Sequence, residues 1–179
     1  IAIKAALTGH LVLSTLHTNN SVGVIPRLVD MGVEPFLIPV SLKAAFSQRL
    51  VRRLCPYCKK KVKAGPLEKK IIKDEIDNLS EKERKEVRIP SPLYIYKSQG
   101  CSKCAQEGTK GRTGLYEVLI MTEELEKTIS TEPSEYKILR EAKRQGMITL
   151  KQDGILKVLE GVVSLEEILK VVETKEGII

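Results

Sequence analysis

The chain has 179 residues, a formal net charge of +7 from 30 Lys or Arg against 23 Asp or Glu, and four Cys but no Trp. This length allows one ordinary domain or a few small subdomains. No apolar run approaches the roughly 18 residues of a membrane-spanning helix. Aromatic residues make up only 4% of the chain, which disfavours a surface that binds nucleic acid by stacking with its bases. Residues 59–88 hold 11 Lys or Arg against 7 Asp or Glu and could attract nucleic acid or an anionic membrane surface, but their mixed charges favour a solvated face.

The first 54 residues predict an alternation of helices and strands. Because the apolar residues 1–7 look like the end of a helix, we expect the chain to be part of a longer one. Residues 10–16 are almost continuously apolar, which is typical of a parallel strand buried on both faces. The remaining expected elements are, in order, a helix from residue 20 or 21 to about 31, a helix over 35–47 and a strand over 48–54.

From residue 55 onward the sequence predicts charged segments, two more strands and then helices. Residues 59–92 are poor in large apolar groups, with room for one or two short helices, and Ser80 and Glu83 have the spacing of a capping box. We expect this stretch to lack a hydrophobic core of its own. The other expected elements are a strand over 93–97, a strand over 113–121 that lies beside 48–54 in one sheet, and helices that begin at Ser134, Thr149 and Ser164.

The cysteines form two Cys-x-x-Cys pairs, Cys55 with Cys58 and Cys101 with Cys104. Each pair fits a tight turn in which two sulfurs converge, and four thiolates make a closed tetrahedral zinc site. The loop of 42 residues between the pairs is longer than the spacing of about 15–20 in compact zinc ribbons, but a longer loop adds little closure entropy. Because protein ligands would fill all four positions, the predicted Zn²⁺ is structural.

Other cysteine chemistries stay open at this point. Disulfides suit exported proteins, and no feature of the sequence points to export. A thioredoxin-type redox site would explain one Cys-x-x-Cys pair but not two. Ligation of an iron–sulfur cluster remains an alternative to zinc.

Two histidines flank the strand predicted over residues 10–16. In open parallel sheets, ligands bind beyond the carboxyl ends of the strands. His17 lies at that end and His10 at the other, so position favours His17 as the residue that contacts a ligand. A single histidine is nevertheless more often structural.

Several segments in a fixed order resemble the motor ATPases of type II secretion and type IV pilus assembly. The segment Thr8–Asn19 looks like the histidine box of that family. The two cysteine pairs resemble those of the assembly and secretion motors, whereas the retraction motors of the same superfamily lack them. The similarity is weak only over residues 60–98. The other matching segments are Arg27–Gly32, Gln48–Arg52, Gly111–Glu117 and Gly146–Leu150.

This resemblance implies an α/β fold in three parts. Residues 1–54 would be the end of a RecA-like P-loop ATPase core, residues 55–110 a tetracysteine zinc-binding insert, and residues 111–179 a returning core strand with an α-helical C-terminal subdomain. The resemblance also implies a homo-hexamer in the full-length protein, with ATP and Mg²⁺ at the subunit interfaces. There His17 would sense the γ-phosphate, and His10 would help to position that segment.

The same resemblance implies a cytoplasmic protein that is peripheral at the inner face of the cytoplasmic membrane. The implied partners are the inner-membrane platform and the cytoplasmic adaptor proteins of a secretion or pilus machine. No nucleic acid is expected among the partners.

The 179 residues contain no Gly-x-x-x-x-Gly-Lys-Ser/Thr phosphate loop and no acidic Walker B strand ahead of the histidine box. We therefore expect the chain to add a phosphate sensor and a zinc module to a site whose other parts lie outside it, and not to hydrolyse ATP by itself. The alternative is a non-enzymatic zinc-binding module that contacts nucleic acid or a partner protein. That interpretation explains the charge and the cysteines but not the histidine box.

Overall fold

The computed structural model of the chain describes residues 1–173. Its backbone contacts group into two compact units. The first unit consists of Ile1–Ser47 and Glu117–Met147, and the second of Gln48–Tyr116 and the chain from Ile148 onward. The three-part division expected from the sequence stays a prediction. None of the helices within residues 1–173 is long and apolar enough to cross a membrane.

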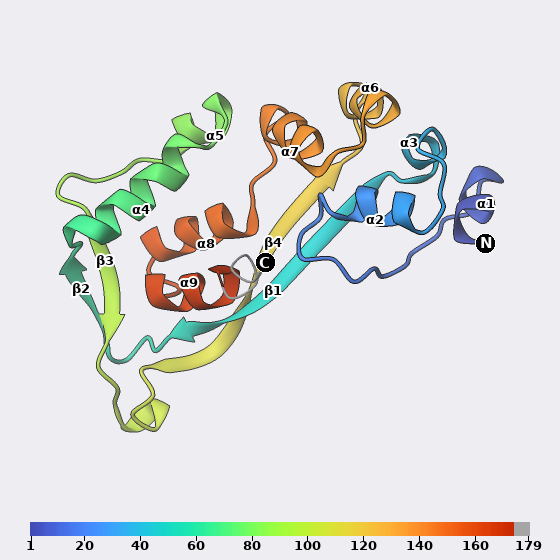
Figure 1. The fold of residues 1–179 in the computed structure, drawn as a ribbon. Coiled ribbons are helices and arrows are strands. Elements are labelled where there is room, and N and C mark those ends of the chain that lie inside the picture. The colour runs from blue at the N-terminus through green and yellow to red at the C-terminus, as the bar shows by residue number, and fades with distance from the viewer. Residues whose placement is uncertain (174–179) are drawn as a thin grey trace. The chain divides into compact units, whose positions relative to one another are not determined.

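Two long strands, β1 (Ala44–Leu54) and β4 (Thr109–Ile120), are hydrogen-bonded neighbours, as the sequence predicts (Figure 1). The backbone N–H of Met121 donates to the carbonyl of Lys43 at 3.0 Å, and that of Cys55 donates to the carbonyl of Gly108 at 2.9 Å. Because low numbers on β1 meet high numbers on β4, the pair is antiparallel. Residues 55–108 therefore connect the end of β1 to the start of β4.

The helix expected over residues 35–47 is wrong in its second half. The helix α3 covers only Leu37–Ser41, and β1 begins at Ala44. Ala45 is buried whereas Phe46 is exposed, so side chains alternate between two faces from the start of the strand. Pairing with β4 decides the conformation of a segment that its own composition leaves ambiguous.

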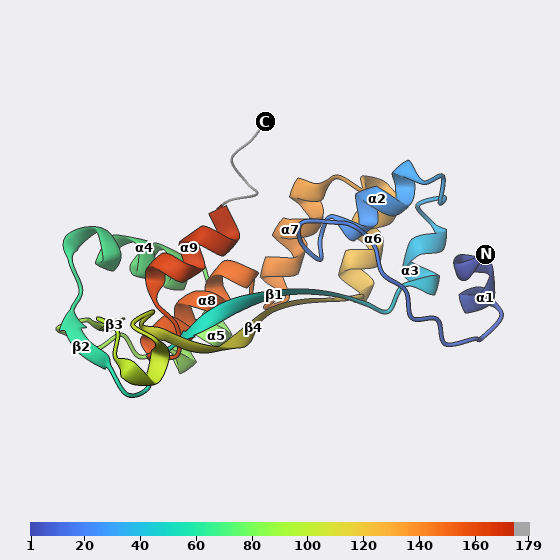
Figure 2. The ribbon, with the colours of Figure 1, turned by 90° about the horizontal axis from the view of Figure 1, so that it is seen from below.

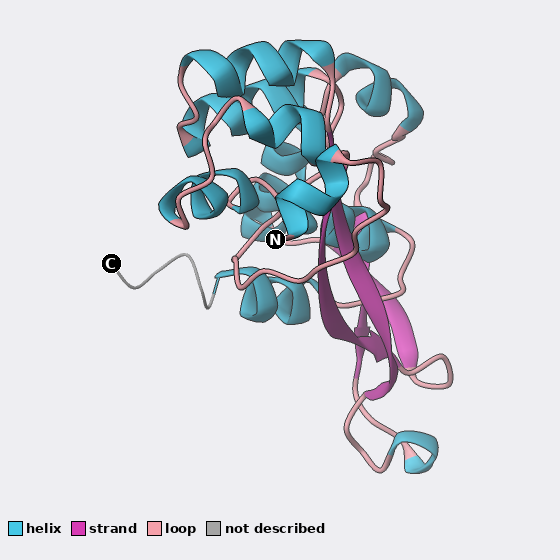
Figure 3. Cartoon of the chain, turned by 90° about the vertical axis from the view of Figure 1, so that its right-hand side faces the viewer, coloured by secondary structure: helices cyan, strands magenta, loops and turns pink. Residues whose placement is uncertain are grey.

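The first unit is built mainly from helices, which Figure 2 labels and Figure 3 colours cyan. Its core consists of fully buried aliphatic side chains, among them Ile25, Ile38, Leu125 and Ile138. The helices α6 and α7 pack against each other, and α3 contacts α6. The helices of this unit are α1 (Ala2–Leu7), α2 (Val24–Asp30), α3, α6 (Glu123–Thr131) and α7 (Glu135–Arg144).

The buried strand expected over residues 10–16 is wrong. This segment has no helix or strand, and the side chains of Leu11 and Leu13 are about nine-tenths exposed. A buried parallel strand needs hydrogen-bonded neighbours for its backbone. Within residues 1–173 the strands pair only as β1 with β4 and β2 with β3, so residues 10–16 have no strand hydrogen-bonded beside them.

As far as residue 173, the second unit combines a short antiparallel strand pair with four helices. Strands β2 (Lys59–Lys63) and β3 (Tyr94–Ser98) are antiparallel, with Val62 opposite Ile95. The strand β3 confirms the one expected over 93–97, whereas β2 was not predicted. The helices are α4 (Pro66–Asp77), α5 (Glu81–Glu86), α8 (Leu150–Leu159) and α9 (Leu165–Glu173), with a single 3₁₀ turn, η1 (Ser102–Cys104).

Residues 59–92 were expected to lack a hydrophobic core of their own, and the structure places their buried side chains in a core that they share with helices distant in sequence. Ile72 and Ile76 lie one turn apart on α4 and are buried, as is Ile95 on β3. They belong to the same cluster as Ile155 of α8 and Ile168 of α9. A few apolar side chains are enough here because helices distant in sequence supply the rest of the core.

Local signals place the ends of the last helices correctly. Thr149 and Gln152 form a reciprocal capping box at α8: the Gln152 N–H donates to Thr149 Oγ1 at 3.3 Å, and the Thr149 N–H donates to Gln152 Oε1 at 2.9 Å. Ser164 caps α9 through the Glu167 N–H. At α5, Ser80 accepts from the Glu83 N–H at 3.5 Å, which is half of the predicted box.

Replacing Gly161 with Ala is expected to destabilise the second unit for two reasons. Gly161 follows α8 with φ of +68°, and an added Cβ would lie 2.5 Å from Cδ2 of Tyr96. We expect Gly161→Ala to lower the free energy of unfolding by about 2–4 kcal/mol, as the sum of a left-handed backbone cost and overpacking. Gly111 is the matched control, because its φ is +76° but an added Cβ would contact nothing within 4 Å. Urea unfolding of both variants checks this; equal losses would exclude the ring contact.

Candidate metal centre and histidine segment

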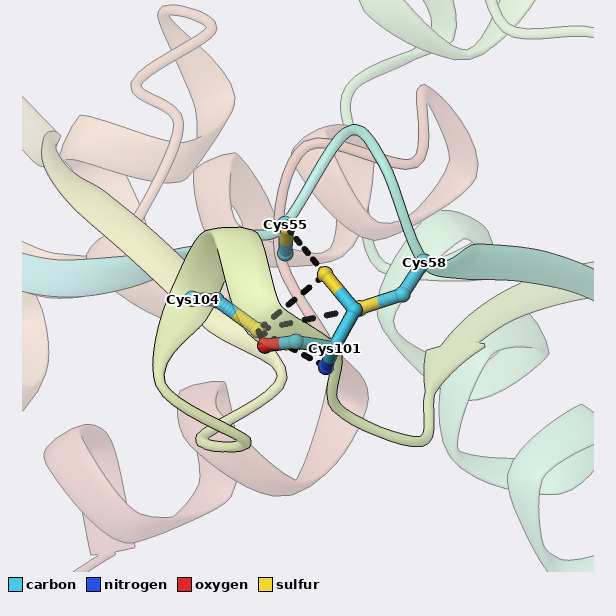
Figure 4. Close-up of side chains that lie close together, drawn as sticks. All are labelled: Cys55, Cys58, Cys101 and Cys104. Carbon is cyan, nitrogen blue, oxygen red and sulfur yellow. Dashed lines mark hydrogen bonds between the residues drawn. The ribbon is translucent and has the colours of Figure 1, made fainter.

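The two Cys-x-x-Cys pairs stand on turns that the strand pairing brings together (Figure 4). Cys55 and Cys58 lie between the end of β1 and the start of β2, and Cys101 and Cys104 bracket η1 between β3 and β4. The antiparallel pairing of β2 with β3 sets Lys59 opposite Ser98. The bond from the Cys55 N–H to the Gly108 carbonyl joins the other two strands at the same point. Residues 46 positions apart in sequence thus face each other.

The four sulfur atoms have the spacing of a zinc–thiolate site. All four lie within 4.8 Å of one another. The Sγ–Sγ distances are 3.9 Å for Cys55 with Cys101, 3.9 Å for Cys58 with Cys104 and 3.7 Å for Cys101 with Cys104. A tetrahedral ion with metal–sulfur bonds of about 2.3 Å places its ligands about 3.8 Å apart. The cysteines are free, at distances far beyond the roughly 2.05 Å of a disulfide.

Burial and backbone donors complete the surroundings of the sulfurs. Cys55 and Cys104 are buried, and Cys58 and Cys101 are half-buried. The backbone N–H groups of Cys101 and Gly108 each donate to Cys104 Sγ at 3.3 Å. Such donors stabilise a thiolate, which is the form that binds a metal. The donor set therefore fits a closed, four-coordinate, soft-metal site.

Without a metal, the pKa values of Cys58 and Cys104 move in opposite directions. Desolvation, followed by hydrogen bonds to neighbouring cysteines, raises the pKa of the Cys58 thiol to about 12. Desolvation also raises the pKa of Cys104, but the backbone N–H groups of Cys101 and Gly108 outweigh it and bring that pKa to about 7. Crowded thiolates repel one another, and a divalent cation at the centre removes that repulsion.

Zinc binding to the metal-free chain is expected to release protons. Near neutral pH at least the Cys58 thiol is protonated, and every ligand must lose its proton to bind. The apparent affinity for Zn²⁺ should therefore fall as the pH falls. Calorimetric titration in two buffers of different ionisation enthalpy measures the number of protons released. A binding enthalpy that is the same in both buffers would contradict this prediction.

The two candidate histidines lie in the first unit, on the irregular segment that follows α1. Both side chains are exposed. Thr8 Oγ1 donates to the carbonyl of Ala5 at 2.9 Å and lies 3.1 Å from Nδ1 of His10. Because the hydroxyl proton is already donated, this pairing favours a protonated Nδ1 on His10. The structure thus links His10 to the end of α1 and leaves the His17 imidazole accessible.

A buried polar pair in the first unit was missed by the sequence analysis. Glu117 on β4 and Ser21 are both buried. The Ser21 N–H and its hydroxyl donate to Glu117 Oε1 at 2.8 and 2.6 Å. The one signal in the sequence is an acidic residue between the apolar Leu115 and Leu119 of a predicted strand. That signal does not name the partner, which is 96 residues away.

Comparison with known proteins gives consistent matches over almost the whole chain. The family profile described as Type II/IV secretion system protein matches residues 1–170. The chain is 43% identical to Type II secretion system protein E of Pseudomonas aeruginosa over 96% of its length, and 43% identical to Type II secretion system ATPase E of Vibrio cholerae over 99%. It is 44% identical to Type IV pilus assembly ATPase PilB of Thermus thermophilus over 94%.

These matches cover only part of each relative. The chain spans 31% of the Pseudomonas protein, 32% of the Vibrio protein and 18% of the Thermus protein. The resemblance found in the sequence motifs is confirmed at the level of the family, and the four clustered cysteines agree with it. The chain belongs to the type II/IV secretion system protein family.

Proposed function

We propose that the chain is part of a hexameric motor ATPase that powers type II protein secretion or type IV pilus assembly, to which it contributes a structural zinc module and a phosphate-sensing histidine. The proposal rests on one combined observation: four sulfurs at zinc-site spacing in a chain 43–44% identical to secretion and pilus ATPases. The phosphate loop and the Mg²⁺ carboxylate would lie outside these residues.

Cys55, Cys58, Cys101 and Cys104 would hold the Zn²⁺. The ion supplies a cross-link between two turns rather than chemistry, because four protein ligands leave no position for water or substrate. The Leu54 N–H donates to the Val162 carbonyl at 2.9 Å, and Lys59 Nζ donates to the Gly161 carbonyl at 2.7 Å. A metal at the turns would therefore stiffen the junction of β1 and β2 with the turn between α8 and α9.

His17 would contact the γ-phosphate of ATP, or a water beside it, in the assembled protein. Its exposed imidazole is available to a ligand that the rest of the protein would hold. An imidazole N–H donates to a phosphate oxygen as neutral ring or as cation. His10, bonded to Thr8 at the other end of the segment, would help to set its course.

The test uses the complete protein that contains this chain. We expect it to hydrolyse ATP in the presence of Mg²⁺, to sediment as a hexamer and to co-purify with inner-membrane platform or cytoplasmic adaptor proteins. Deleting the gene in the source organism should abolish either secretion of an exported protein or surface pili. A complete protein that neither turns over ATP nor binds it would overturn the proposal.

A second candidate, a zinc module that contacts nucleic acid, has one observation in its favour. One face of β2 and β3 carries Lys61 and Lys63, with Lys61 Nζ 4.9 Å from the centre of the Tyr94 ring and Lys59 Nζ 5.1 Å from that of Tyr96. The lysine ammonium groups already lie over the tyrosine rings, so these rings are less available to stack with bases.

Titration with a DNA duplex at increasing salt separates the two candidates. Tight binding that falls steeply with salt concentration would favour the nucleic-acid module. We expect only weak binding at low salt, because the Lys-rich segment also carries acidic residues.

A further inference from the structure

Glu117 is the most unusual polar side chain of the first unit because it is a carboxylate in a strand of buried apolar residues. Only 4% of its surface is exposed. Removing a carboxylate from water is costly unless hydrogen bonds replace the lost hydration. An aliphatic side chain would fill this buried position without that cost, so the carboxylate needs a hydrogen-bond partner.

Glu117 holds Ser21. A single oxygen, Oε1, accepts from both the backbone N–H and the hydroxyl of Ser21, at 2.8 and 2.6 Å. Ser21 is itself completely buried. Hydrogen bonds to a charged acceptor in a dry environment are among the stronger ones in proteins. The contact therefore fixes the backbone of Ser21 to β4 with two bonds at one point.

The residues between His17 and Ser21 form a short, cross-linked tether. Thr18 Oγ1 donates to the Asn20 carbonyl at 2.9 Å. Asn20 Oδ1 accepts from the Gly23 N–H at 2.7 Å, and its amide Nδ2 donates to Glu135 Oε1 of α7 at 3.2 Å. The segment before His17 has no helix or strand. The position of His17 is thus set mainly from its C-terminal side, through Asn20 and Ser21.

We propose that Glu117 is a positioning residue: by anchoring Ser21 to β4 it fixes the segment that carries His17. The anchoring itself follows from the contacts above, and its consequence for ATP turnover rests on the proposed function of His17. Glu117 contacts no nucleotide in this scheme. It acts through the three residues between His17 and Ser21, whose conformational freedom it reduces.

Hydrogen-exchange mass spectrometry of the complete protein tests the anchor. Glu117→Ala removes the acceptor, and Ser21→Ala removes one of the two donors without leaving a large cavity. We expect amides in residues 17–24 to exchange about tenfold faster or more in Glu117→Ala, and less so in Ser21→Ala. Glu117→Gln keeps an oxygen at Oε1 and should restore most of the protection. Residues 123–131 of α6 serve as the internal reference.

Ser41→Ala is the matched control for the serine change. Ser41 is half-buried in the same unit and its hydroxyl donates to the Leu37 carbonyl at 2.6 Å, away from the Glu117 contact. It should leave exchange in residues 17–24 unchanged. Should Glu117→Ala fail to fold, Ser21→Ala against Ser41→Ala still decides. The anchor is overturned if both Glu117→Ala and Ser21→Ala exchange like the wild type in this segment, or if Glu117→Gln exchanges as fast as Glu117→Ala.

ATP turnover separates this inference from the proposed function. If His17 senses phosphate, Glu117→Ala should lower kcat about tenfold with little change in the KM for ATP, and Glu117→Gln should restore it. Faster exchange in Glu117→Ala with unchanged turnover, in a protein that His17→Ala inactivates, would refute the positioning role. Unchanged turnover in His17→Ala would refute the proposed function and leave the exchange result intact.

Discussion

Cys104→Ser is expected to abolish stoichiometric zinc binding and to lower the Tm of the chain by about 10 °C or more. Cys104 is the buried sulfur that receives two backbone N–H bonds and lies within 4 Å of both Cys58 and Cys101. Serine is a poor ligand for zinc, and three remaining thiolates leave the site open to water. Structural zinc contributes about 10–16 kcal/mol to small metal-dependent domains. Because this unit also has its own hydrophobic core, we expect a smaller loss in its free energy of unfolding, of about 5 kcal/mol or more.

Metal analysis and thermal unfolding measure this effect directly. The wild type should contain about one zinc per chain, and Cys104→Ser much less. Ser102→Ala is the control, because Ser102 lies in the same turn, is exposed and carries no sulfur. Wild-type zinc content and Tm in Cys104→Ser would show that the sulfurs do not hold a structural metal.

The damage should extend to α8 and α9 rather than stay within the cysteine turns. The buried side chains of α4 and β3 share one cluster with those of α8 and α9. The turn that carries Cys55 is bonded to Val162 through Leu54. We therefore expect amides of residues 150–170 to lose protection together with those of residues 59–98 after chelation. Loss confined to residues 55–104 would contradict the shared core.

His17→Ala is expected to lower ATP turnover by the complete protein about 10- to 100-fold. That range corresponds to one hydrogen bond from a positioned group to a charged phosphate, which is worth about 1.5–3 kcal/mol. The side chain is exposed in the isolated chain, so its removal should cost the fold little. His10→Ala should have a smaller effect, since His10 is bonded to Thr8 at the far end of the segment.

The measurements on His17→Ala must distinguish a loss of phosphate sensing from a loss of stability. Zinc content and the Tm of His17→Ala should equal those of the wild type, and its kcat should fall more than its affinity for ATP. Turnover in His17→Ala within about twofold of the wild type would refute the sensor role. A parallel fall in Tm would assign the residue to the fold instead.

The cysteine site and the last three helices could be predicted because their signals are local. A Cys-x-x-Cys pair fixes two sulfurs on one turn, and two pairs in one chain suffice to suggest a shared metal. The Thr149 and Ser164 caps lie within three residues of the groups they bond. The prediction that residues 48–54 and 113–121 lie side by side in one sheet is confirmed by the pairing of β1 with β4.

The mistakes arise where an apolar segment takes its conformation from partners. Residues 10–16 have the composition of a buried strand but lie exposed, since β1 and β4 pair with each other and not with them. Ala44–Ser47 continues a helical pattern, yet it forms β1 because β4 is beside it. The sequence did not predict that Ile72 and Ile76 pack with α8, which lies far away in the chain.

By itself the sequence determined the family of this protein, the four candidate metal ligands and the starts of the last three helices, because each depends on residues a few positions apart or on motifs in fixed order. Only the tertiary structure decided that the four sulfurs lie within 4.8 Å, that residues 59–98 share a core with α8 and α9, and that Glu117 binds Ser21. These are contacts between residues far apart in the chain. Their geometry depends on strand pairing and side-chain packing, which no local pattern encodes.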